Sequence, residues 1–262
     1  MRLSPHFLVL AAVGNLLAVP ALAQPTRVAD YNRIGWAVYE GDHALGPRFT
    51  LHTEYQWRRV DFGGDWQQSL ARLGGGYQLA PRVQLGAGYT SLVTHVYGAY
   101  PTAGTGVPFP EHRLHADVSL SDTLGRLVLG QRVRLERRWI GQLNEGARRG
   151  DIASWQPQQR IRYQLQAQWP LQGARLDNRE WYLTGFDEVF LSFGRHVGSN
   201  VFNQNRIAGG LGYQFSSDFQ VELCYLNQIT QHGEPDPRTE LPVFEFNHGF
   251  RLGVVYNFRL LK

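Results

Sequence analysis

Apolar and polar residues alternate along most of the chain after residue 30. Between positions 126 and 139, leucine, valine and tryptophan fall mainly on odd positions, and arginine and glutamate fall mainly on even ones. The segment 159–169 repeats this arrangement, with apolar residues opposite arginine and glutamine. Successive side chains of a β-strand point to opposite faces, so a period of two predicts strands, whereas a helical period is hard to find.

Alternating segments of about ten residues are separated by clusters of Gly, Pro, Asp and Ser, which are turn residues. This division predicts an all-β fold with about eleven strands and no internal domain boundary. The strands are expected near 33–40, 48–59, 67–79, 82–97, 111–121, 126–139, 159–169, 181–193, 204–215, 219–230 and 244–258.

The predicted connections alternate in length. Short periplasmic turns that alternate with longer extracellular loops are typical of a bacterial β-barrel. Tyr and Trp also recur near the ends of the apolar faces, where the aromatic girdles of such barrels lie. The pattern therefore favours a transmembrane antiparallel up-and-down β-barrel over a soluble sandwich. Its longest extracellular loops are expected around 98–110, 140–158 and 231–243.

Strand number is the difficult point of this prediction. A barrel made from one bacterial chain normally has an even number of strands. We therefore expect ten or twelve strands, so that one of the eleven segments is miscounted. The candidate is the first segment, around Ile34 to Tyr39, which we expect to be short, split or tucked inside the barrel.

The N-terminal region has the three parts of a secretory signal peptide. Arg2 is followed by an apolar run from Phe7 to Val19 and then by Ala21-Leu22-Ala23, a small-x-small cleavage site. We expect residues 1–23 to be removed, which leaves a mature chain that begins at Gln24. No later stretch reaches the roughly 20 apolar residues that a spanning helix needs. The expected product is a single β-barrel domain, 24–262, in the outer membrane of a Gram-negative bacterium.

Composition agrees with a β-rich protein and excludes some partners. Aromatic residues make up 13% of the chain, and there is a single Met. The formal charge of +4 includes Arg2, so the mature chain carries about +3, too little to predict nucleic-acid binding. Cys224 is the one cysteine, so no intrachain disulfide can form, and we expect it to be a small structural side chain.

Charged residues on the polar faces of the predicted strands are the candidate functional groups. An arginine at the bilayer midplane costs about 2–4 kcal/mol, so these residues are expected to line the lumen. Two interpretations stay open: the charges pair across a closed lumen, or they line a narrow pore for small polar or anionic solutes. The predicted lumen-lining residues are Glu54, Arg58, Arg72, Arg113, Asp117, Arg132, Arg134, Glu136, Arg138, Arg160, Arg162, Glu188, Arg206, Glu222, Glu245 and Arg251.

A lipid-modifying hydrolase of the outer membrane is the competing function. Its candidate residues are His196 and Ser199, which lie on opposite faces if the strand continues, and no Gly-x-Ser-x-Gly motif is present. His112 and His115 also diverge on a strand, which argues against a metal site. We therefore expect no catalytic residue, no metal and no cofactor.

Two motifs in the carboxy-terminal part of the chain carry a family resemblance. Asn203-Gln204-Asn205-Arg206 is followed by Gly210-Leu211-Gly212-Tyr213, and Glu222 is followed by Tyr225-Leu226-Asn227-Gln228. Trp36, Arg58, the Arg132, Arg134 and Arg138 row and Glu188 fit the same pattern. Over essentially the whole mature length the chain resembles a bacterial family, domain of unknown function 2490. The resemblance implies an outer-membrane barrel without an established biochemical activity.

These observations predict a monomeric, non-enzymatic outer-membrane protein, either a closed structural barrel or a narrow pore. The expected partners are outer-membrane lipid and lipopolysaccharide. The barrel-assembly machinery and periplasmic chaperones are expected partners during biogenesis only.

Overall fold

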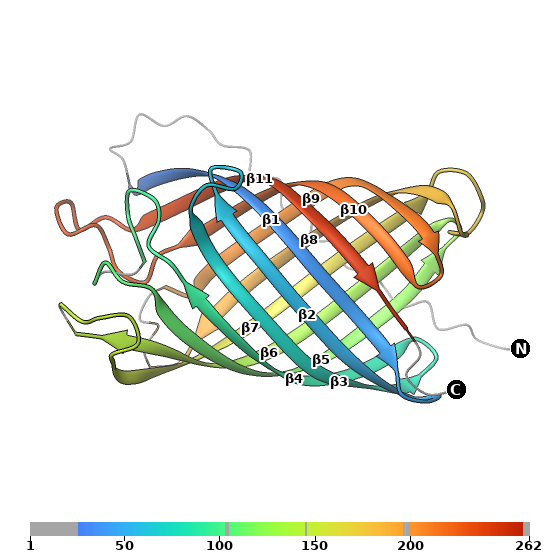
Figure 1. Ribbon diagram of the computed structural model, residues 1–262, viewed down its shortest axis with the longest axis horizontal. Helices are drawn as coiled ribbons and strands as arrows, with labels where there is room; N and C mark the ends of the chain where they lie inside the picture. Colours follow the sequence, from blue (N-terminus) through green and yellow to red (C-terminus); the bar gives the residue numbers. More distant parts are fainter. Residues whose placement is uncertain (1–25, 103–104, 145, 196, 198–199, 259–262) are drawn as a thin grey trace, which may run out of the picture.

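The computed structural model describes residues 26–102, 105–144, 146–195, 197 and 200–258, and in this part of the chain eleven strands form one closed β-barrel (Figure 1). The predicted signal peptide lies outside the described residues. No helix among them is long and apolar enough to cross a membrane. The strands are β1 (Val28–Ala44), β2 (Phe49–Val60), β3 (Trp66–Ala80), β4 (Val83–Thr94), β5 (Phe109–Leu124), β6 (Leu127–Leu143), β7 (Ile152–Pro170), β8 (Glu180–Phe193), β9 (Phe202–Ser216), β10 (Phe219–Gln231) and β11 (Val243–Tyr256).

The barrel is closed by a parallel pair of strands. Neighbours in sequence pair antiparallel, but β1 pairs parallel with β11, from Val28 beside Val243 to Glu40 beside Val255. The predicted barrel fold is confirmed, and the expectation of an even strand number is wrong. An odd number of strands closes when the first and last run in the same direction. β1, expected to be short, is 17 residues long and a full member of the wall.

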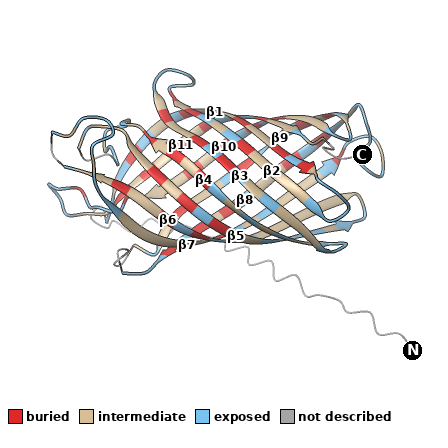
Figure 2. Cartoon of the chain, turned by 60° about the horizontal axis from the view of Figure 1, so that its bottom comes forward, coloured by how far each residue is buried: buried red, intermediate tan, exposed pale blue. Residues whose placement is uncertain are grey.

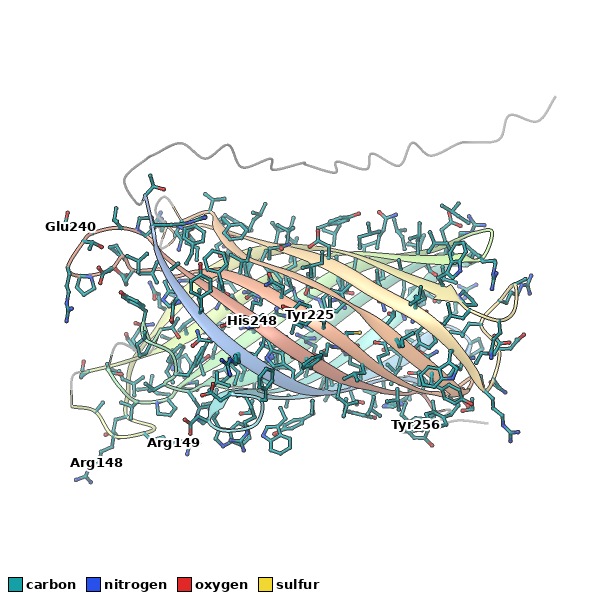
Figure 3. The ribbon with its side chains drawn as sticks, turned by 90° about the horizontal axis from the view of Figure 1, so that it is seen from above. Arg148, Arg149, Tyr225, Glu240, His248 and Tyr256 are labelled. Carbon is teal, nitrogen blue, oxygen red and sulfur yellow. The ribbon has the colours of Figure 1, made fainter. Side chains whose placement is uncertain are left out.

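The two ends of the barrel differ in the length of their connections (Figure 1). We call one the loop end, where residues 61–65, 95–108, 144–151, 194–201 and 232–242 connect strands. At the other, the turn end, the connections are 45–48, 81–82, 125–126, 171–179 and 217–218. The long loop predicted over 140–158 is shorter, because β6 continues to Leu143 and β7 begins at Ile152. Arg148, Arg149 and Glu240 lie at the loop end, and Tyr256 lies at the turn end (Figure 3).

Large apolar side chains cover the outside of the barrel. Leu73, Leu135 and Leu223, in the middle parts of their strands, are each more than half exposed. Aromatic side chains gather toward both ends. At the loop end Tyr31 stacks on Phe246 and Trp57 contacts Trp66, and at the turn end similar contacts join Trp181 to Tyr213 and Phe219 to Tyr256.

The inner face of the barrel has an apolar side and a charged side. Buried and exposed positions alternate along the strands, as Figure 2 shows. Apolar side chains from β1, β9 and β10, including Ile34, Trp36 and Leu226, form a buried cluster on one side. Cys224 belongs to this cluster, which fits its predicted structural role. Charged side chains fill the rest of the interior and form the candidate site.

Candidate functional site

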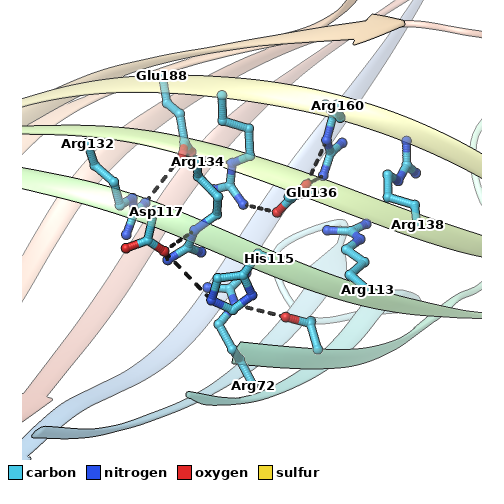
Figure 4. Close-up of polar contacts among 12 residues, drawn as sticks. Arg72, Arg113, His115, Asp117, Arg132, Arg134, Glu136, Arg138, Arg160 and Glu188 are labelled. Atoms are coloured by element: carbon cyan, nitrogen blue, oxygen red, sulfur yellow. Dashed lines mark hydrogen bonds and ion pairs between the residues drawn. The ribbon is translucent and has the colours of Figure 1, made fainter. Parts of the chain in front are cut away.

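The inward-facing charges of β2, β3 and β5 to β9 form a largely buried layer inside the barrel, and Figure 4 shows the part of it on β3 and β5 to β8. We call it the central charge network. Its nine arginines are Arg58, Arg72, Arg113, Arg132, Arg134, Arg138, Arg160, Arg162 and Arg206, and its five carboxylates are Glu54, Glu111, Asp117, Glu136 and Glu188. Alternation along each strand explains the layer, because residues two apart share the inner face.

Each carboxylate in this network contacts at least one arginine. Glu111 accepts hydrogen bonds from Arg113 Nε at 2.6 Å and from Arg138 Nε at 2.5 Å. Its second oxygen accepts from the Nη2 atoms of the same two arginines at 3.1 and 3.0 Å. Glu54 is paired with Arg72 on the neighbouring strand. The pairs therefore link adjacent strands from the inside.

Glu136 and Glu188 extend the network along the inner face of β6, β7 and β8. Glu136 binds Arg160 at 2.6 Å and Arg162 at 2.7 Å. Arg162 also binds Glu188 at 2.5 Å, so one guanidinium joins two carboxylates. The chain of contacts continues from Glu188 to Arg132, 3.4 Å away. Shared partners of this kind hold the side chains in one arrangement.

Asp117 lies beside a histidine that the network surrounds. Its carboxylate binds Arg134 at 2.7 Å and lies 3.7 Å from His115 Nε2. His115 thus faces the interior, whereas His112 lies on the outer wall against Tyr89 and Trp155. The two histidines diverge as predicted. Among the described residues, no group of three or more His, Cys, Asp or Glu could hold a metal ion.

A second set of charges lies on the other side of the interior. Arg251 binds Glu222 at 3.1 Å and Glu40 at 2.8 Å. Glu245 binds His232 Nε2 at 3.0 Å and accepts a hydrogen bond from the Tyr97 hydroxyl at 2.8 Å. Carboxylates near β11 therefore have partners of their own, separate from the central charge network.

The structure places all sixteen predicted lumen-lining residues on the inner face, and all but Arg58 make an ion pair with another described residue. Arg58 lies over the ring of Trp36, 4.1 Å from its centre, and donates to Gln56 and Gln68. Glu111 was not predicted. Its position two residues before Arg113 puts it on the same face, and only its place at the edge of the predicted strand concealed it.

Two separate cavities lie above and below the central charge network. The loop-end cavity has a volume of about 920 Å³, and its floor includes Glu111, Arg113, Arg138 and Arg160. The turn-end cavity, of about 320 Å³, has five glutamines and Arg132 among its lining residues. The cavities share no lining residue. Between them lie Glu54, Arg72, His115, Asp117, Arg134, Glu136, Arg162 and Glu188, whose side chains are at most one tenth exposed.

The described residues after β4, from Tyr97 to Thr102, contribute to the lining of the loop-end cavity. Tyr97 follows β4 but reaches Glu245 on β11. Gly98, with φ +75°, lies so close to β1 that an added Cβ would be 2.8 Å from Asp30 Oδ2. Burial and the negative charge of Glu245 hold the pKa of Tyr97 well above its ordinary value, so the hydroxyl stays protonated and donates. This crossing has no periodic pattern, which is why sequence reasoning missed it.

Comparisons with known proteins agree with the resemblance seen in the motifs. A family model described as "Protein of unknown function (DUF2490)" matches residues 34–239. No curated protein and no solved structure matches the chain. The hydrolase candidates His196 and Ser199 lie outside the described residues. The matched region includes ten of the eleven strands, wholly or mainly, and the central charge network, so the chain belongs to the DUF2490 family of proteins of unknown function.

Proposed function

We propose that this protein is a non-enzymatic β-barrel of the Gram-negative outer membrane whose lumen is closed to the flow of solutes. The observation that carries the proposal is the buried central charge network between two separate cavities. A secretory signal peptide over residues 1–23 accounts for export, and the barrel-assembly machinery with periplasmic chaperones accounts for insertion.

The outer surface supports a membrane location. Outer-membrane barrels have an apolar band flanked by aromatic girdles. On β8 the outward-facing Trp181 and Phe193 lie near opposite ends of the strand. At about 3.3 Å per residue and a tilt of about 40°, they are roughly 30 Å apart along the barrel axis, comparable to a bilayer. The outward Asp187 between them is partnered by Asn205 Nδ2 at 2.6 Å.

A closed lumen explains the charge pairs better than a narrow pore does. The pairs join neighbouring strands, and the side chains of Glu136, Arg162 and Glu188 are at most 6% exposed, so a continuous water path would have to expose groups that are now buried. Disturbing such pairs is costly, at about 3–5 kcal/mol when one partner is removed. The arrangement therefore supports a barrel whose centre is a structural plug made of its own side chains.

Conductance tests the closed lumen directly. Purified protein, with folding shown by circular dichroism and by its heat-dependent migration on gels, is added to a planar lipid bilayer. We expect no current above that of the lipid alone. Stepwise channels that scale with protein concentration would overturn the closed-lumen proposal.

Cell fractionation tests the location. Expressed with its native N-terminal region in a Gram-negative host, the protein is expected in the outer-membrane fraction. Recovery in the soluble periplasm would contradict the proposed membrane location but would not contradict the closed lumen.

A further inference from the structure

We propose that the loop-end cavity is a binding site for a small multivalent anion that carries phosphate or carboxylate groups. The floor of the site is formed by Arg113, Arg138, Arg160 and Arg206. This goes beyond the closed barrel proposed above and does not depend on it, because binding is measured on the folded protein in detergent.

The charge balance of the interior is the first support. The central charge network holds nine arginines and five carboxylates, whereas the second set holds Arg251 with Glu40, Glu222 and Glu245, so the two sets together carry ten arginines and eight carboxylates and the positive excess lies in the network. Buried charge is costly unless it is paired, so a local excess of arginines favours an anion beside them. The cavity is the part of the interior where such an anion has room.

Arg206 places part of this positive charge at the wall of the cavity. Its nearest carboxylate oxygen in the ion pairs of the described residues is Glu188 Oε2, 3.9 Å away, beyond hydrogen-bond distance. The guanidinium instead lies over the rings of Trp36 and Phe190, 5.1 and 4.8 Å from their centres. The Gln204 side-chain oxygen accepts from Arg206 Nε and, at 2.9 Å, from Nη2, so Nη1, which is 3.9 Å from Glu188 Oε2, is the atom whose N–H donors remain for an oxyanion.

A buried hydroxyl gives independent support. Ser192 lines the cavity, is 4% exposed, and its Oγ has no hydrogen-bond partner among the described residues. Buried polar atoms in native proteins almost always have a partner, so the Ser192 hydroxyl is available for a hydrogen bond to a ligand. It sits directly beside Arg160 in the β7–β8 register, which places a free hydroxyl next to a guanidinium.

The acidic residues of the cavity do not cancel this preference. Glu111 is held by two arginines, and Glu245 is held by His232 and the Tyr97 hydroxyl. Asp236, near the mouth, accepts hydrogen bonds from Thr239, and Glu234, which also lines the cavity, is exposed to solvent. The volume of about 920 Å³ is at the upper end for small-molecule sites, so an organic anion fits as well as an inorganic one.

The test is calorimetric titration of the detergent-folded protein with pyrophosphate and, in a second arm, with citrate, at low ionic strength. We expect saturable binding of at least one of them with one site per chain. Pyrophosphate alone would indicate a phosphate ligand, and citrate alone a polycarboxylate. Absence of binding by both, with folding shown, overturns the proposal.

Matched variants locate the site. Arg206 and Arg132 both lie near Glu188, but Arg206 lines the loop-end cavity and Arg132 lines the turn-end cavity. Arg206→Gln should weaken binding at least tenfold, and Arg132→Gln, which removes the same charge, should change it less than twofold. Ser192→Ala, which leaves the charges intact, should weaken binding severalfold. Equal effects of R206Q and R132Q, or none from R206Q and S192A, would contradict the assigned site.

Discussion

At the scale of single residues, three carboxylates of the interior, Glu111, Glu136 and Glu188, each pair with more than one arginine. Glu111 is the clearest case, because both of its oxygens accept from Arg113 and Arg138 and the side chain is 2% exposed. A carboxylate in this position neutralises charge from two neighbouring strands at once. Its loss would leave two guanidinium groups buried without a counter-charge.

We expect Glu111→Gln to lower the free energy of unfolding by about 3 kcal/mol, because removing one partner of a buried charge pair leaves the others uncompensated. The measurement is urea unfolding of the protein refolded into lipid vesicles. The control is Asp122→Asn, which removes an exposed pair with Arg82 and should cost about 0–1 kcal/mol. Similar losses of unfolding free energy in the two variants would show that the buried Glu111 pairs stabilise the protein no more than the exposed pair does.

The inner face could be predicted residue by residue, and the cavity above it could not. Period-two alternation assigns every second residue to one face, so Arg134, Glu136 and Arg138 were correctly grouped. Glu111 was missed because it lies at a strand edge, where a boundary error of two residues removes it. Arg206 was predicted to face inward, but its distance from Glu188 depends on how the whole wall curves.

At the scale of elements, the seam between β1 and β11 decides whether the barrel closes. Ile34 and Gly249 lie directly opposite each other in the parallel register. A Cβ added at Gly249 would fall well inside contact distance of the Ile34 carbonyl oxygen, which is backbone and cannot move aside. Glycine here permits the close approach of the two strands.

Gly249→Ala should therefore prevent closure and sharply reduce the folded fraction after refolding. The measurement is the proportion of protein that resists protease and migrates as the compact form on unheated gels. Gly130→Ala is the matched control, since the nearest atom to its added Cβ is 3.8 Å away, an ordinary contact. If G249A folds as well as G130A, the seam does not require glycine.

Strand positions were predictable from the sequence, but the way the sheet closes was not. A strand that pairs in parallel has the same alternation as one that pairs antiparallel, so nothing local in 33–40 identified β11 as its neighbour. Within 33–40 its inner face has Ile34, Trp36 and Val38, followed by Glu40, which binds Arg251. The parity rule led to the wrong expectation for this segment.

At the scale of the whole molecule, the barrel has an apolar outside and a charged inside, the reverse of a soluble protein. Trp57 and Trp181 are on the outer wall near the loop end and the turn end, about half exposed. Trp36 is 5% exposed and packs among the interior side chains. If the barrel is embedded in a bilayer as proposed, these tryptophans meet different surroundings.

Variants that each retain one tryptophan, with phenylalanine at the other positions, test this arrangement in vesicles containing brominated lipid. Fluorescence of Trp57 and of Trp181 should be strongly quenched, because indole rings at girdle depth contact lipid. Fluorescence of Trp36 should be quenched much less. Equal and weak quenching of all three would show that the wall does not face lipid.

The parallel seam also has a consequence for how the polypeptide traverses the barrel. Each pair of antiparallel strands brings the chain back to the end of the barrel where the pair began. Because the number of strands is odd, the chain starts at one end of the barrel and finishes at the other. Val28 is therefore at the loop end, and Tyr256 is at the turn end. If the barrel lies in the outer membrane as proposed, with its loop end facing the medium, the start of β1 is outside the cell and the end of β11 is on the periplasmic side. Epitopes fused before β1 and after β11 would then be read from opposite compartments.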